Sequence, residues 1–176
     1  MIPPGLAGRL PIPYTSLMSQ HPKPIITICT SASFYRQAVE IDRQLAAMSY
    51  ETIIPITAHR MKESGDFDVS HYRTWQVNAD DYPKKAELMR THFDEISKGD
   101  AILVLNYEKH GRANYIGGNV LMEMALAFYQ KKPVFILNEA PEDSIFLEEI
   151  LGVLPVFLHG RIEDFPEAYA LARTKA

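Results

Sequence analysis

Short apolar runs rich in β-branched residues alternate with amphipathic stripes from residue 24 onward, and this alternation constrains the fold more than any other feature. Apolar runs of this length are typical of buried strands, whereas apolar residues spaced three and four apart line one face of a helix. Five strands are predicted, over residues 24–29, 52–56, 101–105, 133–137 and 153–158. Five helices are predicted between and after them, over residues 34–48, 86–96, 120–129, 144–151 and 163–173.

This order of elements predicts an α/β fold. Strands that alternate with helices form right-handed crossovers and a parallel sheet with helices on both faces. We expect a flavodoxin-like or Rossmann-like three-layer sandwich whose five-stranded parallel sheet has the order 2-1-3-4-5. Proline at position 55 makes the second strand an edge strand, because proline cannot donate to a central ladder.

Two segments interrupt the pattern. Six of the twelve prolines lie within residues 1–24, so we interpret residues 1–23 as a Pro-rich N-terminal arm and residues 24–176 as a single domain. The arm also carries apolar side chains, which favours docking on the body or on another subunit. Residues 58–84 form a connection long enough to be a functional lid or a disordered loop.

Composition excludes several classes of function. The net charge of −4 offers no basic stripe, so we expect no nucleic-acid polymer as a partner. No apolar run approaches the roughly 18 residues that span a bilayer, so we expect no membrane partner. The chain has one cysteine, Cys29, and no paired Cys and His spacing, so we expect no metal site. A cytoplasmic location is the corresponding expectation.

Three features lie where ligands bind in such folds, beyond the carboxyl ends of the strands. Ser31 lies between the first strand and its helix, where it either binds an anion or caps the helix. Gly117 and Gly118 follow the third strand, in a loop that either approaches a ligand closely or is simply solvated. Glu123 is the one charge in the apolar run 120–128, and it lies either in a buried site or on a wet helix face.

A resemblance favours the functional interpretation of these features. The segments Gly99–Asn106, Tyr115–Asn119, Glu123–Ala127 and Lys132–Val134 resemble the nucleoside 2-deoxyribosyltransferase family, and Ile26–Ser31 looks like its first strand and phosphate-side loop. The similarity covers roughly residues 24–160, and the Gly-Gly-Asn…Glu stretch is its most specific part.

The resemblance implies cleavage or transfer of the N-glycosidic bond of a nucleoside or nucleotide. Glu123 matches the glutamate that attacks the anomeric carbon in that family. The resemblance also implies no metal or organic cofactor and a homodimer or higher homo-oligomer that completes the pocket. The residues expected to bind the substrate are Ser31, Asn106, Gly117, Gly118 and Asn119.

The chain departs from the family at two positions. Thr27 stands where the family has a tyrosine, and His92 stands where it has the aspartate that protonates the leaving base. A histidine suits an acid because its pKa lies near neutrality, so His92 is the second candidate catalytic residue. Two alternatives stay open: a phosphoribohydrolase of the cytokinin-activating type, and a non-catalytic nucleotide sensor.

Overall fold

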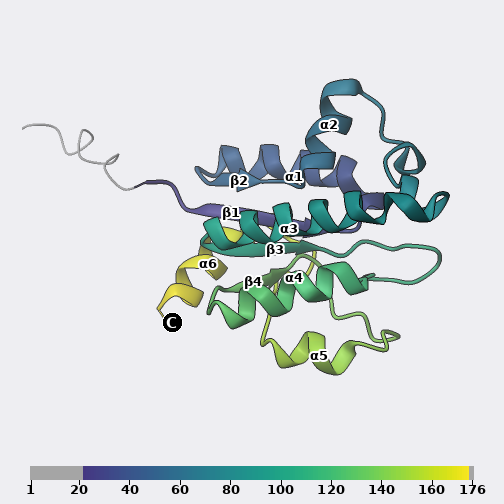
Figure 1. Ribbon diagram of the computed structural model, residues 1–176. Helices are drawn as coiled ribbons and strands as arrows, with labels where there is room; N and C mark the ends of the chain where they lie inside the picture. Colours follow the sequence, from purple (N-terminus) through teal and green to yellow (C-terminus); the bar gives the residue numbers. More distant parts are fainter. Residues whose placement is uncertain (1–21, 175–176) are drawn as a thin grey trace, which may run out of the picture.

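A five-stranded, fully parallel sheet forms the centre of the computed structural model, which describes residues 22–174 (Figure 1). Its strand order is β2-β1-β3-β4-β5, which confirms the predicted α/β fold and order 2-1-3-4-5. The strands are β1 (Ile25–Thr30), β2 (Glu51–Ile53), β3 (Ala101–Leu105), β4 (Val134–Ile136) and β5 (Val156–Phe157).

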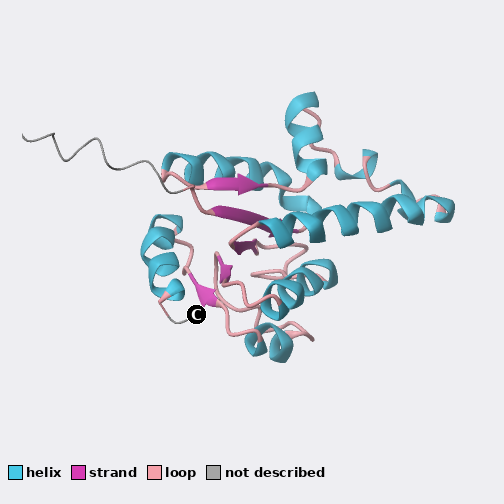
Figure 2. Cartoon of the chain, turned by 60° about the vertical axis from the view of Figure 1, so that its left-hand side comes forward, coloured by secondary structure: helices cyan, strands magenta, loops and turns pink. Residues whose placement is uncertain are grey.

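Helices cover both faces of the sheet (Figure 2). Buried side chains form two apolar cores between the sheet and these helices. Alternate residues of a strand point to opposite faces, so Ile28 joins one core and Cys29 joins the other. The first core contains α1 (Tyr35–Ala47) and α6 (Phe165–Arg173). The second contains α3 (Tyr82–Lys98), α4 (Gly118–Tyr129) and α5 (Leu147–Gly152).

The long connection between the second strand and the next helix is more regular than the sequence suggested. The prediction of a strand through residue 56 is wrong: β2 ends at Ile53, and Pro55 caps a further helix, α2 (Ile56–Ser64). Proline at a helix start loses nothing, because the first N–H groups of a helix have no partner within it. Three 3₁₀ turns follow, at Val69–His71, Thr74–Gln76 and Ala79–Asp81, so this segment is neither disordered nor featureless.

The predicted N-terminal arm, residues 1–23, lies outside the described residues apart from its last two. Within residues 22–174, no helix has both the length and the apolar character needed to cross a membrane.

The switch point of the sheet lies between β1 and β3. Thr30 pairs with Leu105 at the carboxyl ends of these strands, and the Thr30 hydroxyl donates a hydrogen bond of 2.8 Å to the Leu105 carbonyl. From this edge β1 leads to α1 on one face, and β3 leads to α4 on the other. The diverging connections leave a crevice at the carboxyl edge, where ligands bind in doubly wound sheets.

Candidate active site

A cavity of about 570 Å³ occupies this crevice. Its volume is within the range of small-molecule sites. The lining comes from the loop after β1, from α2 and the turns that follow it, from α3, and from the loop and helix after β3. The lining residues include Ser31, Tyr35, Tyr72, Arg73, Trp75, His92, Glu95, Lys109, Tyr115, Gly117, Gly118, Asn119 and Glu123.

Glu123 lies in the second turn of α4 and reaches into the cavity. The residue is only 8% exposed, which rules out the wet helix face considered from the sequence. Its Oε2 atom is buried and has no hydrogen-bond partner within the described residues. A carboxylate oxygen left without a partner costs free energy, so this atom is poised for a ligand.

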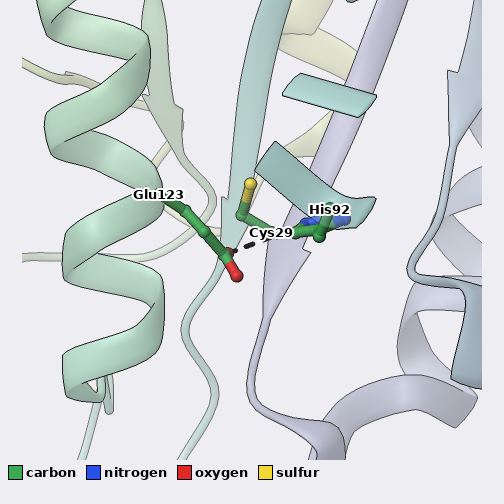
Figure 3. Close-up of side chains that lie close together, drawn as sticks. All are labelled: Cys29, His92 and Glu123. Carbon is green, nitrogen blue, oxygen red and sulfur yellow. Dashed lines mark ion pairs between the residues drawn. The ribbon is translucent and has the colours of Figure 1, made fainter. Parts of the chain in front are cut away.

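His92 faces Glu123 from α3, as Figure 3 shows. The Nε2 atom of His92 lies 3.7 Å from Oε2 of Glu123, and it too has no hydrogen-bond partner within the described residues. On the other side of the ring, Nδ1 lies 2.7 Å from Oε2 of Glu95, one helical turn away on α3. With Nδ1 protonated, His92 donates this bond, which fixes the ring and aims Nε2 at Glu123.

Cys29 completes a cluster with these two residues (Figure 3). It lies in β1 and is fully buried. Burial raises the pKa of the thiol well above its ordinary value, and the nearby Glu123 carboxylate raises it further. The thiol is therefore neutral when Glu123 carries its charge.

The pKa values of Glu123 and His92 are both raised above their ordinary values. Burial raises the pKa of Glu123 from 4.5 to about 7, and the charge of His92 and the Cys29 thiol oppose this shift. Burial disfavours the charged form of His92, but its bond to Glu95 and the charges of Glu123 and Glu95 raise its pKa above the ordinary value. A carboxyl whose pKa is raised to about 7, beside an imidazole whose pKa is raised above its ordinary value, is suited to nucleophilic and acid–base catalysis.

A second group of side chains gives the cavity a cationic region. The Lys109 ammonium donates a hydrogen bond of 3.0 Å to the Ser31 hydroxyl and lies 4.8 Å from the centre of the Tyr115 ring. Burial and the charge of Arg73 lower the pKa of Lys109, which indicates that the two cations are close. Within residues 22–174 neither Lys109 nor Arg73 forms an ion pair, so both remain available to an anion.

A tight turn positions Lys109. Lys109 and Arg112 exchange two backbone hydrogen bonds across His110 and Gly111, and both turn residues have positive φ. Such two-residue turns favour glycine, which adopts positive φ without strain. The turn directs Lys109 to the cavity, whereas His110 and Arg112 do not line the cavity.

Aromatic side chains form much of the remaining wall. Tyr35, at the start of α1, is close enough to Glu123 and Arg73 to respond to both: burial and the Glu123 charge raise its pKa, and the Arg73 charge lowers it. Tyr72 and Trp75 come from the turns after α2 and also line the cavity. Thr27, which stands where the resembled family has a tyrosine, is buried outside the lining and donates a hydrogen bond to the Glu95 carbonyl.

Most of the residues predicted from the sequence come together in this cavity. Glu123, His92, Ser31, Gly117, Gly118 and Asn119 all line it. A Cβ atom on Gly118 would meet no neighbouring atom within 4 Å, so a side chain at this position would project into open space.

Asn106 is the one predicted residue that the structure places elsewhere. It is fully buried behind the cavity, where its amide donates to the Glu139 carbonyl at 2.8 Å and its Oδ1 accepts from the Asn138 N–H at 2.9 Å. Its side chain ties the ends of β3 and β4 together and does not line the cavity.

The sequence did not reveal Glu95, Tyr35 and Arg73 as members of the site. Glu95 was detectable, because a residue three positions after His92 shares its helix face. Arg73 carried no signal, since it lies in 3₁₀ turns without hydrophobic periodicity. Neither a protein-family model nor a curated protein matches the chain.

Proposed function

We propose that the protein cleaves the N-glycosidic bond of a nucleoside 5′-monophosphate, with Glu123 as nucleophile, and passes the sugar to water or to a second base. The observation that carries the proposal is the buried pair in the cavity. Two polar atoms, Oε2 of Glu123 and Nε2 of His92, face each other at 3.7 Å, and neither has a hydrogen-bond partner among the described residues 22–174. A nucleophile and an acid placed together in this way are the groups that a retaining glycosidase needs.

In the first step a carboxylate oxygen of Glu123 forms a bond to C1′ of the sugar as the bond from C1′ to the base nitrogen breaks. The electron pair of that bond goes to the base, and the proton on Nε2 of His92 neutralises the base as it leaves. The ionised Glu123 also stabilises the positive charge that develops on the sugar. Glu95 holds the opposite ring nitrogen at 2.7 Å and favours the protonated imidazole.

In the second step water, or the nitrogen of an incoming base, attacks C1′ and displaces Glu123 with its electron pair. His92, now neutral, accepts the proton that the attacking group releases. Both residues return to their initial protonation states, so no cofactor is needed for the balance of the reaction.

The rest of the cavity suits the two ends of a nucleotide. Lys109, Arg73 and the Ser31 hydroxyl offer a phosphate two cations and a hydrogen-bond donor. Trp75 and Tyr72 provide aromatic surface on which a base can stack.

A base-release assay tests the proposal. The wild-type protein and Glu123→Gln are incubated with matched ribo- and deoxyribonucleosides and their 5′-monophosphates, and free base is quantified. We expect the wild type to release base from a monophosphate and the variant to lose about 10³-fold or more of that rate. Cleavage of ribonucleotides alone favours the phosphoribohydrolase, and binding without cleavage favours the sensor. Equal rates for the wild type and Glu123→Gln would overturn the assignment of Glu123 as the nucleophile.

A further inference from the structure

We propose that Cys29, His92 and Glu123 bind one zinc-like divalent cation. One ligand atom from each residue lies within 4.8 Å of the others, and the three residues come from β1, α3 and α4, as Figure 3 shows. The proposal that a cation binds is independent of the proposed enzymatic activity. It differs from the expectation drawn from the sequence, where residues this far apart formed no metal-binding motif.

The spacing of the ligand atoms is close to that of a tetrahedral site. Zinc bonds of about 2.0–2.3 Å place neighbouring ligand atoms roughly 3.2–3.7 Å apart. The His92 and Glu123 atoms are already 3.7 Å apart, and Cys29 completes the triangle within 4.8 Å. A small inward movement of side chains therefore closes the site, and the backbone of the sheet and helices keeps its place.

Two observations point to a ligand between these residues. His92 and Glu123 are 7% and 8% exposed, and their facing atoms have no hydrogen-bond partner within residues 22–174. Glu95 holds Nδ1 of His92 from behind at 2.7 Å. A carboxylate that orients the distal nitrogen of a histidine is the usual outer shell of a zinc-bound histidine.

The donor set selects the class of cation. Thiolate and imidazole favour zinc and other borderline transition metals, whereas magnesium and calcium prefer oxygen ligands. Binding releases the thiol proton, because the thiolate is the ligand. His92 and Glu123 line the cavity, so the cation has a path inward and keeps a position open to water or an anion.

Zinc would then inhibit the proposed reaction. This consequence rests on the proposed function, because the cation occupies the Glu123 carboxylate that attacks the sugar and the His92 nitrogen that protonates the base. Zinc thereby competes with protons for the site, and its binding strengthens as pH rises.

Metal binding is measured directly on the full chain after treatment with EDTA. Equilibrium dialysis against Zn²⁺ is expected to give one equivalent bound per chain. Co²⁺ is expected to give a thiolate-to-cobalt charge-transfer band, which reports ligation by the one cysteine in the chain. Cys29→Ser is expected to lose the band, and Cys29→Ser and His92→Gln are each expected to lose at least tenfold in zinc affinity. An excess of Mg²⁺ should not displace the zinc.

His159→Gln is the matched control, because His159 is an exposed histidine that contacts a carboxylate, Glu139, at 2.6 Å. It should bind zinc as the wild type does. Absence of zinc binding by the wild type, absence of the cobalt band, or equal affinity in the control and His92→Gln would each overturn the site. Circular dichroism verifies that each variant is folded. If Cys29→Ser does not fold, Glu95→Gln gives a second test, because it is expected to weaken zinc binding about tenfold. If the chain binds zinc but releases no base, the metal site is supported and only the proposed function is overturned.

Discussion

The Nε2 atom of His92 lies 3.7 Å from the Oε2 atom of Glu123, and within residues 22–174 neither atom has a hydrogen-bond partner. The distance is too long for a hydrogen bond between the two. Both residues are more than nine-tenths buried at the floor of the cavity. Unpaired buried polar atoms are rare in proteins, and water, ions and catalytic roles are among the reasons for them. Both proposals rest on this pair.

The first prediction concerns stability against pH. The pKa of Glu123 is raised from 4.5 to about 7, so the folded chain holds a proton that the unfolded chain releases between these pH values. Its contribution to the free energy of unfolding therefore falls as pH rises through this window. The raised pKa of His92 acts in the same direction: its stabilisation is full below the ordinary value and is lost as pH rises through the folded-state pKa.

Glu123→Gln removes the first of these contributions. We expect its stability relative to wild type to increase by about 1–3 kcal/mol between pH 4.5 and pH 8, because the buried charge no longer has to form. Urea unfolding at a series of pH values measures this difference. Glu149→Gln, a change at an exposed residue of α5, should show no such dependence. An equal profile for the two variants contradicts the account of a buried, perturbed carboxyl.

The second prediction concerns the pH dependence of kcat/KM. We expect a bell-shaped profile, because Glu123 must be ionised and His92 protonated, with the apparent pKa values belonging to the pair. Glu95→Gln removes the charge that raises the pKa of His92 and replaces the charged hydrogen-bond acceptor with a weaker, neutral one. The alkaline limb should therefore move to lower pH, by more than the acid limb moves.

Asp94→Asn is the control for this experiment, since Asp94 is exposed on the same helix and lies outside the cavity lining. Its profile should match that of the wild type. An unchanged alkaline limb in Glu95→Gln would show that Glu95 does not act through His92.

The third prediction separates phosphate recognition from catalysis. Lys109→Met should raise KM for a nucleoside 5′-monophosphate by about 10–100-fold, the effect of losing one charged hydrogen bond, and should change KM for the nucleoside little. Arg112→Met is the matched control, because Arg112 lies on the same turn but outside the cavity lining. The same increase in both variants would indicate a general effect of net charge.

The fourth prediction distinguishes two asparagines, Asn106 and Asn119, that were both predicted from the sequence to bind the substrate. Asn106→Ala should lower the free energy of unfolding by about 1–3 kcal/mol, because it removes two hydrogen bonds that the buried Asn106 amide makes to the loop after β4. Asn119→Ala changes an exposed residue of the cavity rim and should alter stability by less than about 0.5 kcal/mol while raising KM. Denaturant unfolding and steady-state kinetics on both variants measure the contrast.

The sequence predicted the fold well, because parallel strands and their helices leave strong periodic signals. The run 101–105 became a fully buried central strand, and the position of Glu123 in an apolar helix behind two glycines led to the site. The signal failed in residues 58–84, where α2 and short 3₁₀ turns have weak periodicity. Arg73 was missed for this reason.

Other features depended on contacts that no local pattern encodes. The amide of Asn106 looks like a ligand-binding group in the sequence, but it binds two backbone groups more than 30 residues away. Cys29, His92 and Glu123 meet only because β1, α3 and α4 pack together. The expected homo-oligomer, the cytoplasmic location and the role of the N-terminal arm stay predictions.

The most direct test of the central claim is to trap the sugar on Glu123. The protein is incubated with a 2′-fluoroarabinonucleoside 5′-monophosphate, whose fluorine disfavours the oxocarbenium-like transition state and slows release of the sugar. Mass spectrometry of the quenched, digested protein then locates the adduct. The account predicts a fluorinated sugar phosphate on the peptide that contains Glu123, and no adduct in Glu123→Gln. An adduct on a different residue, or an equal yield in the variant, would contradict it.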